Sequence, residues 1–391
     1  MIQKNLLKLA LLSASFLLVT GYAIAYCIPD YQTLFPTKSA AAIEFLVTIS
    51  ALAVMVVMFI SNFVAKKIGK KNTVLLGLII VAISSFISAY AKTYEMMFFS
   101  RLVYGVGLGL VNALAISMID DFFTGNECAT MMGFRNAVEG LGQTALVAFA
   151  GIVYEAYGYM YVPYVYLSAI PIFIIFMLFI PKDKPLKNVV TIKKETDAKT
   201  QLIPWNAMPH CLLLLFTVLV SVGFFIKVHD LLQSQNLDAS YANSLMTAIS
   251  FCMVVGGLLF GVIYNKIKFH ALSLSLLLTG ISCIIIVFAT NVYVFYIACC
   301  INGFAYPFIV SYIFNMIGSL SKNTSNVIVT SWMLIGCNVG AFATPLGFVL
   351  VSDISGRPEA MFGFLTFGVI FLIILALIMV FKNKFIIPNE S

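Results

Sequence analysis

The chain has 391 residues, of which 61% are hydrophobic and only 10% are charged, with a mean hydropathy of +1.02 and a formal net charge of +7. This composition excludes a soluble globular domain, and apolar runs of about 20 residues predict helices that span a bilayer. A closed membrane barrel is also excluded, because its strands alternate between lipid-facing and polar positions. The sequence therefore predicts an all-α, polytopic membrane protein.

The first 25 residues allow two interpretations. Lys4 and Lys8 precede an apolar run, and Ala23-Ile24-Ala25 resembles the cleavage site of a signal peptide. The run continues to Ile28, however, and eleven further apolar spans follow it. Retaining it gives an even number of spans with both termini on one side, so we expect an uncleaved first transmembrane helix.

Twelve membrane spans are predicted from the apolar runs. They cover residues 6–28, 44–65, 73–91, 96–119, 129–154, 160–180, 209–231, 241–263, 271–290, 293–316, 325–351 and 359–381. The only long polar stretch, 181–208, contains six lysines and has no apolar period, which predicts a cytoplasmic linker. We expect an N-terminal six-helix bundle over 1–180 and a C-terminal six-helix bundle over 209–391.

Positive charge is distributed unevenly between the loops. Outside the predicted spans, the lysines and arginines fall in segments on the side of the termini, except for Lys38, Lys92 and Arg357. Cytoplasmic loops carry the excess of positive charge in membrane proteins, so both termini and the linker are predicted to be cytoplasmic. The net charge thus needs no nucleic-acid partner.

The fourth and fifth spans carry three charges at membrane depth. An ionisable side chain there costs about 2.5–3.5 kcal/mol on insertion scales and therefore faces a bundle interior or a cavity. The spacing keeps each set of polar residues on one helical face: Arg101, Tyr104 and Asn112 in the fourth span, and Arg135, Glu139 and Gln143 in the fifth. We predict a polar seam, which is either functional or a structural pair in which Arg135 and Glu139 neutralise each other.

Glycines in the fourth span indicate close packing. Gly105, Gly107 and Gly109 lie inside an apolar run with no preceding strand, so helix contacts explain them better than a nucleotide-binding loop. Gly105 also corresponds to Gly303 at a lag of about 200 residues, as other glycines and the basic loops do, which supports two repeated halves.

The second half offers polar and aromatic candidates for a substrate site: Asn302, Tyr306, Trp332 and Asn338. Together with Tyr104, Asn112 and Gln143 they suit an amphipathic or heteroaromatic solute, although ordinary packing explains Tyr306 and Trp332 equally well. For Lys227, His229 and Asp230, near one end of the seventh span, we expect anchoring at the membrane interface.

Twelve spans in a six-plus-six arrangement, with a basic loop after the second span, resemble the major facilitator superfamily. The family's loop signature is Gly-x-x-x-Asp-Arg-x-Gly-Arg-Arg/Lys. In residues 62–71 the central glycine and the basic positions match, whereas Lys66 stands in the acidic position. The resemblance implies a cytoplasmic gate formed by Lys67, Gly69, Lys70 and Lys71, with Asp120 and Asp121 as substitute carboxylates. Anchoring of the topology is a compatible second role for the lysines.

The fourth span is similar to a motif of drug/proton antiporters in this superfamily. Arg101-Leu-Val-Tyr104-Gly105 matches the pattern Arg-x-x-x-Gly, whose arginine is linked to proton transfer. The tract from Ile28 to Pro36 is also similar to that branch. The Gly-Pro signature of its fifth helix is absent, because Phe149-Ala150-Gly151 lacks the proline.

No cofactor is expected. The eight cysteines contain no CxxC spacing and the three histidines are scattered, which argues against a metal site and a disulfide framework. No phosphate-binding loop or nucleophile–base pair indicates an enzyme.

Three functions remain open. The first is proton-coupled export of a small amphipathic molecule, such as a drug or a metal-chelating metabolite, with Glu139, Arg135 and Arg101 in coupling. The second is uptake of an organic anion or nutrient by a symporter or uniporter, and the third is a receptor or scaffold that transports nothing. We expect a monomer in a bacterial cytoplasmic membrane, with a small-molecule substrate and protons as its partners.

Overall fold

The computed structural model describes residues 2–18, 20–123, 125–181, 203–320, 326–356 and 359–380. Every regular element within these ranges is a helix, which confirms the predicted all-α fold class. The chain divides into two compact units, Met1–Asp197 and Ala198–Ser391. Most of the predicted linker 181–208 lies outside the described residues.

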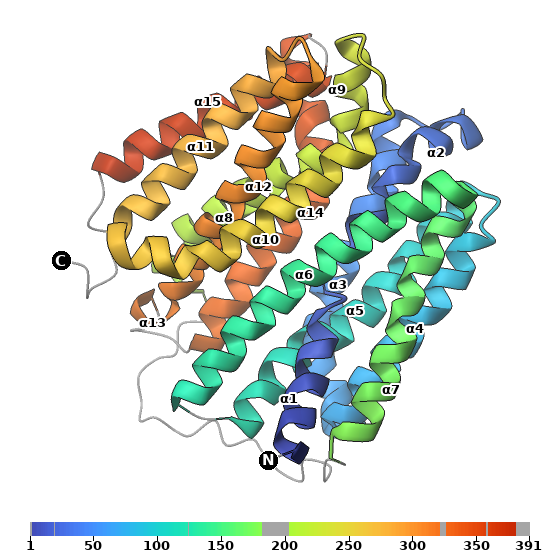
Figure 1. The fold of residues 1–391 in the computed structure, drawn as a ribbon, viewed down its shortest axis with the longest axis vertical. Helices are drawn as coiled ribbons and strands as arrows, with labels where there is room; N and C mark the ends of the chain where they lie inside the picture. The colour runs from blue at the N-terminus through green and yellow to red at the C-terminus, as the bar shows by residue number, and fades with distance from the viewer. Residues whose placement is uncertain are drawn as a thin grey trace. The chain divides into compact units, whose positions relative to one another are not determined.

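Each unit is a helical bundle (Figure 1). Unit 1 contains α1 (Ile2–Ser15), η1 (Thr20–Cys27), α2 (Ile28–Leu34), α3 (Ala40–Ile68), α4 (Lys70–Ala89), α5 (Tyr94–Phe122), α6 (Gly125–Tyr157), η2 (Tyr159–Ser168) and α7 (Ala169–Phe179). Unit 2 contains η3 (Trp205–Ala207), α8 (Met208–Ile226), α9 (Val228–Ser234), α10 (Tyr241–Ile267), α11 (Phe269–Val287), α12 (Val292–Asn315), α13 (Ile317–Leu320), α14 (Asn326–Ser355) and α15 (Glu359–Val380). The elements η1, η2 and η3 are 3-10 helices.

The two units repeat one order of elements at a lag of about 200 residues. The short helices α2 and α9 each have 7 residues and occupy equivalent places. Two close helix contacts use equivalent glycines as well. A Cβ atom on Gly105 would lie 2.4 Å from the carbonyl oxygen of Ser50, and one on Gly303 would lie 2.4 Å from that of Ile249. Small residues at these positions let the helix backbones touch.

Among the described residues, 10 helices are long and apolar enough to cross a membrane. They correspond to the predicted spans except the first and the fifth. The fifth is nevertheless one continuous helix, α6, of 33 residues. Its charged and amide side chains lower its hydropathy below that of its neighbours.

The prediction of one unbroken helix over 6–28 is wrong. Helix α1 ends at Ser15, a turn follows, and the chain then continues as the 3-10 helix η1 before α2 begins. Serine, threonine and glycine around the break are weak helix formers, and Pro29 fits the first turn of a new helix. Apolar composition does not distinguish a continuous span from such a broken one.

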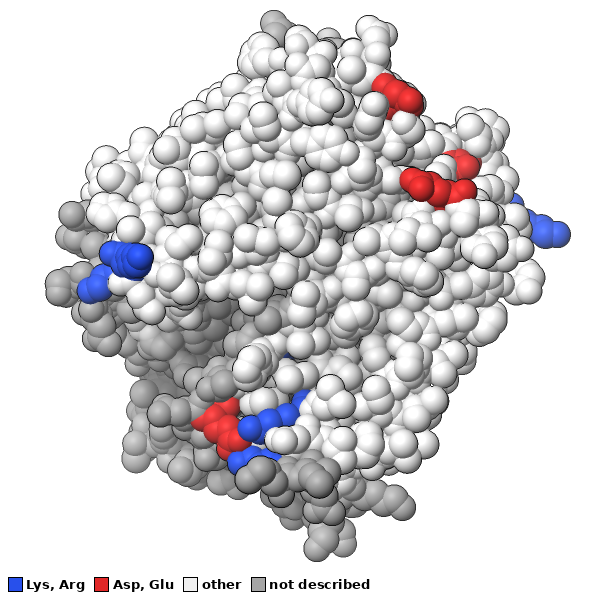
Figure 2. All heavy atoms as spheres, in the orientation of Figure 1, with Lys and Arg blue, Asp and Glu red and all other residues white. Residues whose placement is uncertain are grey.

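The surface between the helix ends is apolar. Figure 2 shows a face on which charged side chains form only a few small clusters. Large hydrophobic side chains such as Phe63, Phe99 and Ile152 are more than half exposed. A contiguous apolar surface of this kind is stable against lipid and not against water.

The backbone strain at Lys268 is predicted to be relieved by a glycine. Gly69, between α3 and α4, has φ +88°, whereas Lys268 fills the equivalent junction of α10 and α11 at φ +45°. A side chain in that region costs about 1–2 kcal/mol relative to glycine. Lys268→Gly should therefore raise the thermal stability of the purified protein in detergent. Asn236→Gly, at φ +56°, is the control and should change it less, because asparagine tolerates that conformation; equal shifts would contradict the argument.

Candidate functional site

The predicted seam between α5 and α6 is present in unit 1. Arg135 Nη1 lies 3.0 Å from Glu139 Oε2, and Arg135 Nη2 donates a hydrogen bond of 3.5 Å to Asn112 Oδ1. The side chains of Arg135 and Glu139 are only 10% and 23% exposed. Gln143, one turn further along α6, is buried too. Counting about 1.5 Å per residue, Glu139 lies about 21 Å into a helix about 50 Å long, and so near its middle.

Arg101 does not join this seam. Its Nε donates to the carbonyl oxygen of Leu46 at 3.0 Å and its Nη2 donates to that of Gly21 at 2.9 Å. Its guanidinium carbon lies 4.5 Å from the ring centre of Tyr104 and 5.4 Å from that of Tyr166. The structure thus separates the predicted coupling residues into two clusters.

The break in the first span explains how Arg101 is accommodated. In the irregular segment η1 the carbonyl of Gly21 accepts hydrogen bonds from both Arg101 and the hydroxyl of Tyr166, the latter at 3.3 Å. Hydrogen bonds from a charged donor contribute about 1.5–3 kcal/mol each, and a buried cation–π contact about 2. These terms offset the cost of about 2.5–3.5 kcal/mol of placing arginine at membrane depth.

The predicted gate residues lie where α3 meets α4. Lys67 is exposed, Gly69 forms the one-residue turn, and Lys70 makes an ion pair with Asp121. Lys71 is buried and donates to the carbonyl oxygen of Met177 at 2.7 Å and to that of Ile180. Lys71 therefore caps the end of α7. The side chain of Asp120 lies outside the described residues.

Two neighbouring ion pairs tie α1 to the start of α6. Lys4 and Lys8 lie 2.8 Å and 2.7 Å from the carboxylate of Glu127. Their hydrogen bonds hold the pKa of Glu127 below its ordinary value. These contacts join α1 to the first turn of α6.

The candidates of unit 2 are dispersed. Asn302 is fully buried and accepts a hydrogen bond of 3.3 Å from the hydroxyl of Ser221, which joins α12 to α8. Asn338 donates to the carbonyl of Leu334 in its own helix. Tyr306 and Trp332 are half-buried on α12 and α14. Their part in a substrate site stays a prediction.

Interface anchoring is the wrong role for Lys227. An anchoring lysine extends its ammonium group to the membrane surface, yet Lys227 is fully buried and His229 nearly so. The junction of α8 and α9 directs Lys227 inward, with its Nζ 3.8 Å from Asp230 Oδ2 and 5.8 Å from the ring centre of Phe348.

Sequence reasoning missed one buried carboxylic side chain, Glu44 on α3, whose exposed fraction is 0%. It occupies the first position of a predicted span, where an acidic residue is taken for a boundary. Among the described residues no cluster of histidine, cysteine, aspartate or glutamate suits a metal ion.

Comparison with known proteins identifies the family to which the chain is similar. The family model described as Major Facilitator Superfamily matches residues 10–228 and again residues 211–389. Riboflavin transporter RibZ of Clostridioides difficile (strain 630) is 28% identical over 144 residues, which cover 36% of this chain and 31% of that protein. The vesicular acetylcholine transporter of Drosophila melanogaster is 29% identical over 144 residues, 36% of this chain and 24% of that protein.

A longer match is to quinolone resistance protein NorA of Staphylococcus aureus (strain MSSA476), 23% identical over 222 residues, 56% of this chain and 55% of that protein. The chain thus spans between about a quarter and about half of the length of these relatives. Two of these three relatives are named as transporters, and the third is named for quinolone resistance.

Proposed function

Since the chain belongs to the Major Facilitator Superfamily, whose members are membrane transporters of twelve-helix fold, we propose that it exports a small amphipathic molecule in exchange for protons. The observation that carries the proposal is the pair of Arg135 and Glu139 near the middle of α6, with Asn112 beside it. A carboxylate at that depth can take up a proton on one side of the membrane and release it on the other.

The alternative, binding of an organic anion by the buried arginines, has less support. Arg101 donates to two backbone carbonyls, and Arg135 is engaged by Glu139 and Asn112. An anionic substrate would have to displace these partners. Export of a neutral or cationic solute requires no such exchange.

The relatives' names favour an amphipathic ring compound as the substrate. One relative is named for quinolone resistance and another for riboflavin, and both quinolones and riboflavin contain flat nitrogen heterocycles. Stacking on tyrosine and tryptophan with a few amide contacts suits such molecules. We propose Tyr104, Asn112, Gln143, Asn302, Tyr306, Trp332 and Asn338 as substrate-binding residues.

Reconstitution tests this function. Purified protein in liposomes should move ethidium or riboflavin when a pH gradient is imposed and stop when nigericin collapses it. Movement of a carboxylate solute such as citrate down its own gradient, with no response of either probe to pH, would contradict export and favour the anion alternative.

The orientation is proposed from the charge bias and has its own test. We place both termini and the Lys67 loop in the cytoplasm of a bacterial cell, and treat the protein as a monomer. In a cysteine-free background, Lys92→Cys should react with an impermeant maleimide on intact cells and Lys67→Cys should not. Both lysines are exposed, at opposite ends of α4, so the reverse pattern would invert the topology.

A further inference from the structure

A pocket of about 280 Å³ lies at the end of unit 1 that carries the loop between α4 and α5. Its walls come from α2, the last turn of α4, the loop itself, the first turn of α5 and η2, and they include the side chains of Tyr31, Met97, Tyr159 and Met160. None of the residues proposed above for substrate or proton binding lines it. Ligand pockets measure about 300–1,000 Å³, so this one has room for a short apolar group and not for a whole drug-sized molecule.

The wall of the pocket presents mainly apolar atoms. The hydroxyl groups of Ser88 and Ser100 share a hydrogen bond of 2.7 Å, and the Ser100 hydroxyl also lies 3.6 Å from the sulfur of Met97. The ring of Tyr31 packs edge-on against that of Tyr159, with 6.1 Å between the ring centres, and the hydroxyl oxygen of Tyr31 is buried. A cavity of this kind accommodates hydrocarbon better than a polar group.

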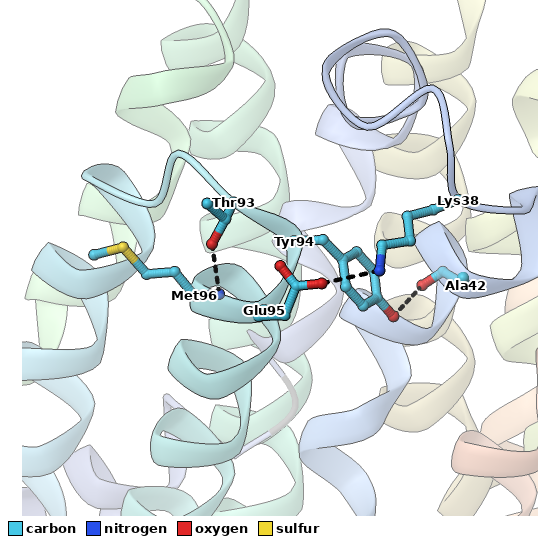
Figure 3. A network of polar contacts seen from close by, with 6 residues as sticks. All are labelled: Lys38, Ala42, Thr93, Tyr94, Glu95 and Met96. Carbon is cyan, nitrogen blue, oxygen red and sulfur yellow. Dashed lines mark hydrogen bonds and ion pairs between the residues drawn. The ribbon is translucent and has the colours of Figure 1, made fainter.

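Lys92 is the one charged residue among the described residues that line the pocket. It is exposed and forms no ion pair with a described carboxylate. Glu95, the acidic residue nearest to it in the sequence, is paired with Lys38 at 2.9 Å (Figure 3). Asp30 on α2 accepts a hydrogen bond of 2.7 Å from Tyr154. The positive charge of Lys92 is therefore available to an anion from outside the protein.

Exposed tyrosines beside the pocket indicate the level of the lipid headgroups. Tyr90, Tyr157 and Tyr161 are at least half exposed and adjoin wall residues at the end of α4 and in η2. The rings of Tyr157 and Tyr161 lie 5.8 Å apart, and the row continues to Tyr164 at 6.1 Å. Tyrosine is enriched where the membrane meets water. Lipid phosphates therefore lie at the same level as Lys92.

We propose that this pocket binds an anionic phospholipid, with the phosphate at the ammonium group of Lys92 and the start of an acyl chain between Met97 and Met160. Lipid tails are as apolar as the wall, so the chain gains little by leaving the bilayer, and selectivity must come from the charge of the headgroup. A cationic solute would be repelled by Lys92. The inference concerns a lipid site within unit 1 and depends neither on the direction of transport nor on proton coupling.

Photo-crosslinking locates the lipid without any transport assay. Purified full-length protein in phosphatidylcholine nanodiscs receives phosphatidylglycerol that carries a diazirine near the start of one acyl chain. Mass spectrometry should find adducts on the pocket wall, at Met97 and Met160. A phosphatidylcholine probe with the same diazirine should label these residues about fivefold less, because its choline ammonium offsets the phosphate charge. Equal labelling by the two probes would overturn the proposal.

Two variants with matched controls separate the charge from the cavity. Lys92→Gln should lower labelling by phosphatidylglycerol about fivefold, whereas Lys266→Gln, the same change at an exposed lysine of α10, should not alter it. Ala91→Leu fills the pocket and should abolish labelling with Lys92 in place, unlike Ala156→Leu at an exposed position of α6. Labelling that survives both Lys92→Gln and Ala91→Leu would contradict a lipid site. Displacement of the probe by soluble glycerol phosphate or by riboflavin would contradict it too, because the occupant would then be a free anion or a transported solute.

Discussion

The Glu139→Gln variant is expected to lose transport against a gradient by more than about tenfold while downhill exchange of the same probe persists. Glutamine keeps the shape of glutamate but binds no proton, so substrate binding and folding should be preserved. One charge moved through 100 mV is worth about 2.3 kcal/mol, enough for more than a tenfold gradient, and this is the contribution that the variant forfeits. Liposomes with an imposed pH gradient, compared with exchange at equal pH, provide the measurement.

Three further variants, Glu155→Gln, Arg135→Gln and the double change of Arg135 and Glu139 to glutamine, separate coupling from simple charge neutralisation. Glu155→Gln is the control, since Glu155 is exposed on the same helix α6, and it should transport normally. If Arg135 and Glu139 are only a structural pair, each single change to glutamine destabilises the protein and the double change restores transport. Full gradient-driven transport by Glu139→Gln would remove this residue from the mechanism.

The helical framework could be predicted because burial in a membrane restricts the backbone to few structures. Each span must satisfy its own backbone hydrogen bonds, so apolar runs become helices wherever they are long enough. The breaks at η1 and at Lys227 could not be predicted in this way. They depend on contacts between residues distant in sequence, such as the hydrogen bond from Arg101 to the carbonyl of Gly21. Because every residue has a backbone carbonyl, the amino-acid pattern does not show which of them accepts such a bond.

The same difference between local and long-range contacts explains which parts of the candidate site could be predicted. The contact of Arg135 with Glu139 follows from a spacing of four residues on one helix, and the sequence predicted it. Placing Arg101 in the same seam was wrong, because two residues on one face of α5 can still meet different neighbours. Arg101 meets η1 and α3, whereas Asn112 meets α6. Which neighbour lies at which level of a helix is a tertiary property.

The second large effect is expected from Gly105→Ala, which adds a single methyl group where α5 crosses α3. That methyl carbon would lie 2.4 Å from the carbonyl oxygen of Ser50 and 2.7 Å from the Cβ of Ala53. Neither is the end of a flexible side chain, so the helices must move apart. Overpacking of this kind costs about 1–3 kcal/mol, and the hydrogen bond from Arg101 to Leu46, one turn away, should weaken with it.

Thermal unfolding in detergent measures the loss of stability. Two glycines of unit 2 provide the comparisons. Gly303→Ala in unit 2 should be equally harmful, since its methyl carbon would lie 2.4 Å from the carbonyl oxygen of Ile249. Gly261→Ala is the matched control within a helix, because nothing lies within 4 Å of its added carbon, and it should be neutral or slightly stabilising. If all three variants unfolded alike, helix propensity and not the close contact would decide, and the glycine of the Arg101–Gly105 motif would have no packing role.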